Sequence, residues 1–225
     1  MKEYNADHPL IVLHIPKTAG VSCRRIYQDW FGEKLLFHYF KEKTAEMPER
    51  HDIFGLHTRD SPVAVYGHFN QSRKFGVEHY YPTAKQFVTI LRDPFERAVS
   101  GYFYLRKCAA SYRDQTRIPR KDLRNYLDNL DSRSTMLNHF PRHMTMNNYQ
   151  EVIETLFVEI GITEQLDESM KRIALKLNRP YASNKLGHFN AAERDQRVPY
   201  DLKEKFIENR PLEYAVYDYV SARFS

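Results

Sequence analysis

The stretch HIPKTAGVS near the N-terminus combines a cation, hydroxyls and small residues in a pattern suited to binding an anion. Lys17 supplies a full positive charge, and Thr18 and Ser22 supply hydroxyl donors. Ala19 and Gly20 are small enough to let an anion approach the backbone closely. This pattern indicates a cradle for a phosphate or sulfate group, whose charge Lys17 and backbone N–H groups would share.

The residues around this loop predict a strand before it and a helix after it. Residues 10–13 form a short apolar run that fits a buried strand. Residues 23–31 carry apolar side chains at helical spacing. The loop is not a Walker A motif, because Lys17 precedes Gly20 instead of following the second glycine. An ordinary strand-to-helix turn with a surface lysine remains an alternative when this stretch is taken alone.

A second strand-to-helix junction follows residues 85–91, which form the clearest β-branched strand of the chain. Asp93 suits an N-cap, Pro94 suits the first helical position, and Glu96 completes the spacing of a capping box. The sequence therefore predicts a helix that begins sharply just after this strand.

Arg92 and Ser100 form a second candidate anion site at this junction. Ser100 follows Arg92 by about two helical turns, so the two side chains can share one side of the helix. A guanidinium group binds a phosphate through two hydrogen bonds, and a serine hydroxyl can donate to the same group. The alternative is an Arg92 that pairs with a carboxylate and a Ser100 on the helix surface. The apolar side chains of this helix are predicted to be its buried stripe: Phe95, Val99 and Phe103.

Length and composition limit the classes of protein to consider. The chain has 225 residues, 42% of them hydrophobic, which suits a single domain over 1–225 with a sizeable core. No segment approaches the roughly 20 apolar residues of a membrane span. Cys23 and Cys108 make neither a disulfide framework nor a zinc site, so a cytoplasmic setting is the simplest expectation. The sequence does not indicate an oligomeric state.

The positive charge of the chain is concentrated in residues 106–142. This segment contains nine Lys or Arg and four Asp or Glu residues, so its net charge of +5 equals that of the whole chain. A basic field attracts anionic partners. A solvated helical surface is the plainer explanation. Nucleic acid is not expected, because no nucleic-acid-binding motif accompanies the charge.

The order of elements predicts an α/β fold: a three-layer arrangement with a mostly parallel central sheet, flanked by helices, and a phosphate-binding strand–loop–helix. Continuous apolar strands separated by helices are typical of such sheets. Ligands of these sheets lie at the carboxyl ends of the strands, where both Lys17 and His68 are expected. The predicted strands are 10–13, 35–40, 62–69, 85–91 and 157–160. The predicted helices are 23–31, 72–80, 94–106, 120–130, 147–157, 163–177, 199–209 and 211–224.

Two long motifs resemble those of the sulfotransferases that use 3′-phosphoadenosine 5′-phosphosulfate (PAPS). These are IPKTAGxS after the first strand and LRDPFERxxSxYxxL after a later one. The pattern is closest to the carbohydrate branch, especially the hexuronyl 2-O-sulfotransferases. The Tyr66-Gly67-His68 sequence resembles the strand end that carries the catalytic histidine of that branch. Residues 157–166 resemble its later strand and its Gly-x-Thr-Glu turn.

The resemblance implies specific roles. Lys17 would lie near the bridging oxygen of the donor, and His68 would be the base that takes the proton of the acceptor hydroxyl. Arg92 and Ser100 would hold the 3′-phosphate. The acceptor would be a hydroxyl-bearing molecule, expected to be a sugar and anionic, the product would be 3′-phosphoadenosine 5′-phosphate (PAP), and no metal would be needed. The residues implied to bind the donor are Lys17, Thr18, Ala19, Gly20, Val21, Ser22, Arg92, Ser100, Lys185 and Arg194.

Other readings of these residues stay open. A small nucleotide or metabolite kinase would need Mg²⁺ and a metal-holding Asp93, which is better explained as a helix cap. A non-enzymatic polyanion-binding protein would use the basic segment alone. His14 is expected to bond to backbone around the loop, and His139 to lie on the surface. Tyr102 and Tyr104 are expected to be packing residues.

Overall fold

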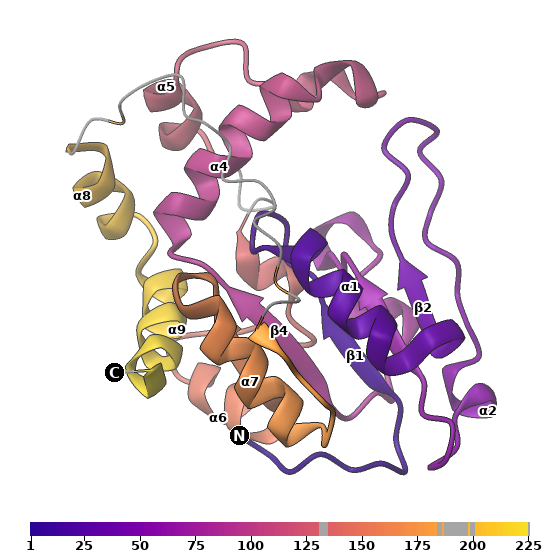
Figure 1. Ribbon diagram of the computed structural model, residues 1–225. Coiled ribbons are helices and arrows are strands. Elements are labelled where there is room, and N and C mark those ends of the chain that lie inside the picture. The colour runs from indigo at the N-terminus through magenta and orange to yellow at the C-terminus, as the bar shows by residue number, and fades with distance from the viewer. Residues whose placement is uncertain (131–134, 184–185, 187–197, 199–200, 225) are drawn as a thin grey trace.

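The chain folds around a five-stranded sheet in which all the strands are parallel, in the order β2-β3-β1-β4-β5. The computed structural model describes residues 1–130, 135–183, 186, 198 and 201–224 (Figure 1). The strands are β1 (Leu10–Leu13), β2 (Leu35–His38), β3 (Ala64–Gly67), β4 (Phe87–Leu91) and β5 (Phe157–Ile162). The α/β class and the parallel sheet predicted from the sequence are confirmed.

Helices cover both faces of the sheet, as the continuous apolar strands require. The described helices are α1 (Gly20–Phe31), α2 (Ile53–Leu56), α3 (Val77–Tyr80), α4 (Pro94–Lys107), α5 (Leu123–Asp128), α6 (Tyr149–Leu156), α7 (Leu166–Lys176), α8 (Asp201–Glu208) and α9 (Pro211–Ser221). Helices α1 and α7 pack on one face, which Figure 1 shows toward the viewer. Helices α2, α3, α6 and α9 contribute to the core on the other face.

The order of the strands creates a crevice between the carboxyl ends of β1 and β4. The chain leaves β1 through α1 toward β2 at one edge of the sheet, and it leaves β4 through α4 toward β5 at the other. Ligands of open α/β sheets bind where neighbouring strands diverge in this way. The loop that contains Lys17 follows β1 and Arg92 follows β4, so both candidate anion sites flank this crevice.

Helix α4 extends from the sheet and builds a separate apolar cluster with α5 and α8 (Figure 1). Phe95 and Val99 are buried in it as predicted, but the third buried residue is Tyr102, whereas Phe103 is only partly buried. None of the described helices is both long enough and apolar enough to cross a bilayer.

Candidate active site

The loop after β1 holds its backbone in an unusual conformation. Lys17 and Ala19 both have positive φ angles, 73° and 60°. The Thr18 hydroxyl donates to the Ile15 carbonyl at 2.9 Å and closes the turn from inside. Helix α1 begins at Gly20 without a side-chain cap. Within the described residues no acceptor contacts the backbone N–H groups of Gly20 or Val21, so these donors point to an anion site at the start of α1.

Only glycine fits at position 20, because the ring of His14 occupies the space that a side chain would need. A Cβ built at Gly20 would lie 1.7 Å from His14 Nε2. The Tyr66 hydroxyl donates to the Gly20 carbonyl at 2.6 Å, in a buried hydrogen bond between β3 and the first turn of α1. The glycine that the sequence assigns to anion approach therefore also lets the loop close onto β1 and β3.

Arg92 lies against this loop. Its Nη1 donates to the Lys17 carbonyl at 3.3 Å, and its Nη2 lies 3.8 Å from a carboxylate oxygen of Glu96. The structure thus brings the two candidate anion sites together, across 75 residues of sequence. Ser100 lies partly buried on α4, two turns after Arg92.

Residues from β5 hold the turn between β4 and α4. The Asp93 carboxylate caps α4 by accepting from the Glu96 N–H at 2.9 Å, as predicted. The reciprocal bond of a capping box comes from Glu164 instead of Glu96, because the Asp93 N–H donates to Glu164 Oε1 at 2.9 Å. Thr163 donates to the Leu91 carbonyl. The Gly-x-Thr-Glu sequence therefore fastens this junction from the end of β5.

The Asp93 carboxylate also pairs with Lys203, at 3.1 Å. A cap and an ion pair account for this residue, which is the metal ligand that the kinase alternative would require. Among the described residues, no group of three or more His, Cys, Asp or Glu side chains is arranged to hold a metal ion.

The Lys17 ammonium lies over an aromatic ring. Its Nζ is 4.1 Å from the centroid of Tyr104, which stands one turn after Ser100 on α4. Tyr104 is 43% exposed, so the sequence-based expectation of a packing residue is wrong for it and right for Tyr102, which is 1% exposed. Burial, and then the charge of Arg92, lower the pKa of Lys17 below its ordinary value.

His68 follows the carboxyl end of β3 beside the same loop. Its Nδ1 lies 2.5 Å from the His14 carbonyl, which can only accept, so Nδ1 carries the proton of the neutral ring and Nε2 keeps a free lone pair. Burial lowers the pKa of His68 to about 4, against the opposing effects of the His14 hydrogen bond and of Glu42. The His68 ring is therefore neutral at physiological pH, with Nε2 as the nitrogen that could accept a proton.

Two further histidines lie next to His68, in places that the sequence did not indicate. The His14 ring is 4.3 Å from that of His68, and its Nδ1 bonds to the Tyr39 hydroxyl at 2.9 Å instead of to backbone. His139 is 6% exposed, so its predicted surface position is wrong, and its ring lies 6.4 Å from His68. Burial holds the pKa of both rings well below the usual range.

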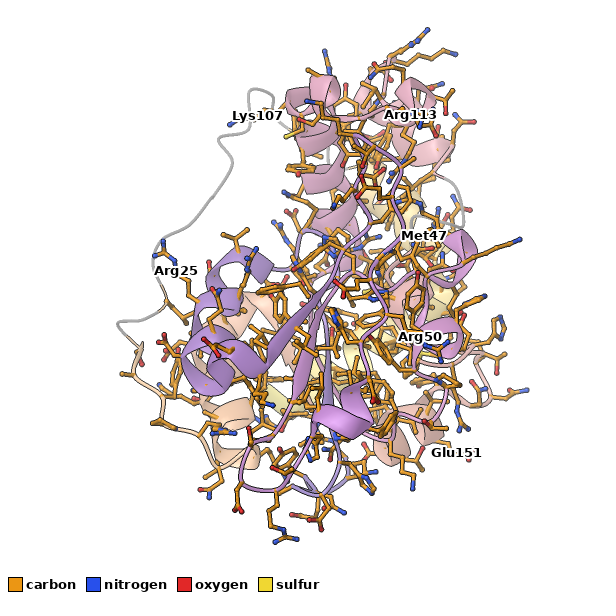
Figure 2. The ribbon with its side chains drawn as sticks, turned by 90° about the vertical axis from the view of Figure 1, so that its right-hand side faces the viewer. Arg25, Met47, Arg50, Lys107, Arg113 and Glu151 are labelled. Atoms are coloured by element: carbon orange, nitrogen blue, oxygen red, sulfur yellow. The ribbon has the colours of Figure 1, made fainter. Side chains whose placement is uncertain are left out.

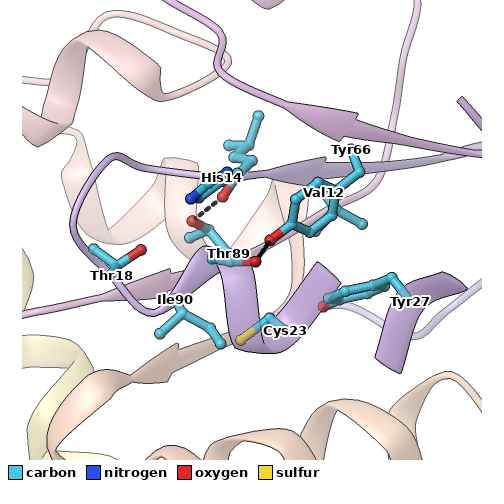
Figure 3. Close-up of a pocket in the computed structure, with 10 residues that line it drawn as sticks. Val12, His14, Thr18, Cys23, Tyr27, Tyr66, Thr89 and Ile90 are labelled. Carbon is cyan, nitrogen blue, oxygen red and sulfur yellow. Dashed lines mark hydrogen bonds between the residues drawn. The ribbon is translucent and has the colours of Figure 1, made fainter. Parts of the chain in front are cut away.

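A small cavity lies beneath the loop, between the sheet and α1 (Figure 3). Its volume of about 10 Å³ has room for about one water molecule. Its lining includes His14, Gly20 and Tyr66, and Figure 3 draws the hydrogen bond from Tyr66 to the first turn of α1. This cavity is too small for a nucleotide.

An ion-paired cluster lies close enough to His68 to influence its pKa. Glu42 contacts Arg73 at 2.7 Å and Arg117 at 2.6 Å, and all three side chains are partly buried. The basic segment is thus partly neutralised where it meets the core. Its outer residues reach away from the sheet: Figure 2 shows Lys107 and Arg113 at the far end of the molecule from Glu151. Lys185 and Arg194 lie outside the described residues.

Comparison with known proteins identifies the family. A model of the sulfotransferase family matches residues 4–197. The chain belongs to this family. No sequence among curated proteins matches it. The mouse sulfotransferase SULT7A1, solved in complex with PAP, superposes with a TM-score of 0.51 at 12% identity, over 96% of this chain and 89% of that one. A sulfotransferase from Alicyclobacillus acidocaldarius superposes with a TM-score of 0.53 at 13% identity, over 95% and 96%.

Because the chain belongs to the sulfotransferase family, sulfuryl transfer is its activity. The kinase and the non-enzymatic polyanion-binding protein are no longer alternatives. The two solved structures support the fold. At such low identity, a structural match shows how the chain is arranged but does not show what its residues do. The resemblance noted in the sequence is therefore correct at the level of the family.

Proposed function

We propose that this sulfotransferase moves the sulfuryl group of PAPS to a hydroxyl of an anionic carbohydrate, with His68 as the general base. The observation that carries the proposal is the hydrogen bond between His68 Nδ1 and the His14 carbonyl, at 2.5 Å. This bond fixes the tautomer whose Nε2 can accept a proton. It also places that ring beside the first turn of the anion-binding loop.

The residues around the crevice fit the two charged ends of PAPS. The N–H groups at the start of α1, which have no acceptor among the described residues, suit the 5′-phosphosulfate together with Lys17. Arg92 and Ser100 suit the 3′-phosphate, because a guanidinium fork matches the geometry of a phosphate. The mouse relative was solved with PAP, which is consistent with such a ligand.

The chemistry assigns a separate task to each side chain. When bound, PAPS supplies an activated sulfuryl group. Lys17 would stabilise the negative charge that develops on the leaving oxygen, an effect that is strongest away from bulk water. His68 would take the proton from the acceptor hydroxyl, which is a poor nucleophile near neutral pH. The cationic side chains and the backbone donors of the loop would neutralise the phosphates.

Two features support an anionic sugar as the acceptor. Tyr66-Gly67-His68 resembles the strand end of the hexuronyl 2-O-sulfotransferases, and the excess positive charge lies in residues 106–142, next to α4. Anionic acceptors would be drawn to this segment, and salt would weaken the attraction.

The test incubates the purified chain with PAPS carrying labelled sulfate and a panel of acceptors. The panel contains a desulfated uronic-acid polysaccharide, the same polymer with its carboxylates reduced, a neutral glucan and a simple phenol. We expect transfer to the uronic-acid polymer, with a KM that rises with salt. Transfer to the phenol alone, or equal use of the carboxyl-reduced polymer at every salt concentration, would overturn the proposed acceptor.

A binding experiment tests the donor separately. Thermal stabilisation by PAP, AMP and ATP–Mg²⁺ is compared at equal concentrations, since a ligand that binds only the folded state raises its stability. We expect PAP to stabilise most, without added metal. Equal stabilisation by AMP and PAP would remove the case for a 3′-phosphate site at Arg92 and Ser100.

A further inference from the structure

The Lys17 ammonium has an aromatic partner and, in the part of the chain that the structure describes, no anionic one. Among the described residues, no carboxylate forms an ion pair with its ammonium, whose recorded contact is the face of the Tyr104 ring at 4.1 Å. The backbone of Lys17 is fixed in the left-handed region, with its carbonyl bonded to Arg92. The loop thus fixes the backbone of Lys17, and Tyr104 on α4 contacts the ammonium at the other end of its side chain.

Tyr104 is arranged as a platform for this ammonium. It stands four residues after Ser100, so both side chains project from the same side of α4. Burial, and then the neighbouring Cys108, raise the pKa of the Tyr104 hydroxyl. An aromatic ring that is 43% exposed contributes little to the core, and so packing does not account for it.

An aromatic ring can position a cation without neutralising it. A carboxylate at this place would hold Lys17 more firmly, but it would cancel the charge and repel an anionic donor. The ring quadrupole attracts the ammonium through the face of the ring and adds no negative charge. Burial lowers the pKa of Lys17, and this attraction to the charged form opposes that effect.

We propose that Tyr104 is a positioning residue for Lys17, holding its ammonium above the donor loop and directed at the leaving oxygen. This inference rests on the proposed function of Lys17. Because the contact of Tyr104 is with the Lys17 ammonium, its loss should act mainly on kcat, with a smaller effect on the affinity for PAP. A cation–π contact at a partly exposed site corresponds to about a two- to fivefold change.

The variants are Tyr104→Leu, which removes the ring, and Tyr104→Phe, which keeps the ring and removes the hydroxyl. Phe103→Leu is the matched control, since it removes an aromatic ring that packs on the α4–α5–α8 cluster. We expect kcat to fall about two- to fivefold in Tyr104→Leu and to be restored in Tyr104→Phe. An unchanged kcat in Tyr104→Leu, or an equal loss in Tyr104→Phe, would overturn the proposal.

A spectroscopic readout tests the contact without any donor or acceptor. Lysines are labelled by reductive methylation with ¹³C formaldehyde, which keeps their charge, and the Lys17 signal is assigned by its loss in Lys17→Arg. A methylammonium over a ring gives a signal upfield of the other lysines. We expect this shift in the wild type, Tyr104→Phe and Phe103→Leu, and its loss in Tyr104→Leu. A Lys17 signal among the other lysines in the wild type would overturn the contact.

The binding of PAP and the response to Tyr104→Leu test the proposed function and this inference separately. A wild-type chain that binds no PAP refutes the donor site, whatever the lysine spectra show. A chain that binds PAP and transfers sulfate, but whose kcat and Lys17 signal do not respond to Tyr104→Leu, refutes the role of Tyr104 alone.

Discussion

The two nitrogens of the His68 ring have different environments, and this difference determines what the ring can do. Nδ1 is committed to the His14 carbonyl, and the neutral ring leaves Nε2 as an acceptor. Burial is the largest cause of the lowered pKa of His68, and the charge of Arg73 lowers it further. The ring is therefore neutral over a wider range of pH than that of a solvent-exposed histidine.

This pKa predicts the acidic limb of the rate profile. Because the pKa of His68 is about 4 in the folded protein, kcat should change little between pH 7 and pH 5 and fall only as the pH approaches 4. Initial rates are measured at each pH after circular dichroism has established that the protein is folded. A midpoint near pH 6.5, the ordinary value for histidine, would show that the ring is solvated during turnover.

Replacing His68 by Ala should lower kcat by about 10²- to 10⁴-fold, the usual size of general-base catalysis. The affinity for PAP, measured by calorimetry, should stay near that of the wild type, because the base acts on the acceptor. His14→Ala is the informative comparison, since its ring lies 4.3 Å from His68. Loss of turnover in folded, PAP-binding His14→Ala, with His68→Ala still active, would assign the base to His14.

Replacing Lys17 and replacing Arg92 should change different kinetic constants, although Arg92 donates to the Lys17 carbonyl. In the proposed site, Arg92→Ala would remove a contact to a phosphate whose charge does not change during the reaction, so it should raise the KM for PAPS and the Kd for PAP. Lys17→Ala would remove the charge proposed to face the leaving oxygen, so it should mainly lower kcat. Steady-state kinetics with varied PAPS measure both. A normal kcat in Lys17→Ala would remove its assigned role.

Gly67 shows how tightly the elements around the base fit together. A Cβ at this position would lie 1.9 Å from the His38 carbonyl, on the neighbouring strand β2. That carbonyl also accepts the backbone N–H of His68, at 2.9 Å. The glycine therefore lets β2 and the end of β3 approach closely enough to fix the backbone of His68.

Gly67→Ala should destabilise the fold by about 1–3 kcal/mol, the typical cost of overpacking, and should also lower kcat because His68 moves. The control is Gly101→Ala in α4, where the new Cβ would meet its nearest neighbour, the Tyr126 hydroxyl, at 3.4 Å. In a helix interior this change should be neutral or stabilising. Urea denaturation and kcat are compared for both variants. Equal stability of Gly67→Ala and the wild type would contradict the tight approach.

Local pattern predicted the elements well because their signals are short-range. The β4–α4 junction could be predicted from Asp93 and Pro94, since a cap acts within one turn. The partner of the Asp93 N–H could not, because Glu164 is 71 residues away and Glu96 offers the same chemistry nearby. Spacing alone cannot tell that the Asp93 N–H bonds to the distant Glu164 when a nearby residue of the same type is present.

The sequence also did not indicate which residues surround His68, because those contacts join distant parts of the chain. Nothing near His139 indicates that the 3₁₀ turn at Met136–His139 packs under His68, 71 residues earlier. Tyr104 did carry a usable signal, since its position one turn after Ser100 places it on the same side of α4. An exposed aromatic at that spacing favours a role at the site over a role in the core.

At the scale of the whole molecule, four histidines should make the protein sensitive to mild acid. Burial lowers the pKa of His14, His38, His68 and His139 below 6.5. As the pH falls below 6.5, the unfolded chain binds protons at these positions that the folded chain does not. Stability is therefore fully present above pH 6.5 and is lost as the pH falls toward about 4.

The free energy of unfolding should fall between pH 6.5 and pH 5, by up to about 1.4 kcal/mol per pH unit for each histidine. Urea denaturation at several pH values measures this slope, in a window above the range where carboxylates titrate. His38→Gln should reduce the slope by about one proton. A flat profile from pH 7 to pH 5 would contradict the depressed pKa values.

The junction between β4 and α4 has a consequence for the order in which the molecule is made. Arg92 stands at a turn that Thr163 and Glu164 fasten from β5, 72 and 71 residues later in the chain. At 5–20 residues per second, a ribosome adds the second half of this junction about 4–14 seconds after the first. The loop after β1 is complete long before, so the two halves of the crevice mature at different times. A nascent chain that ends before β5 should therefore gain nothing from PAP, and the nucleotide can stabilise only the finished sheet.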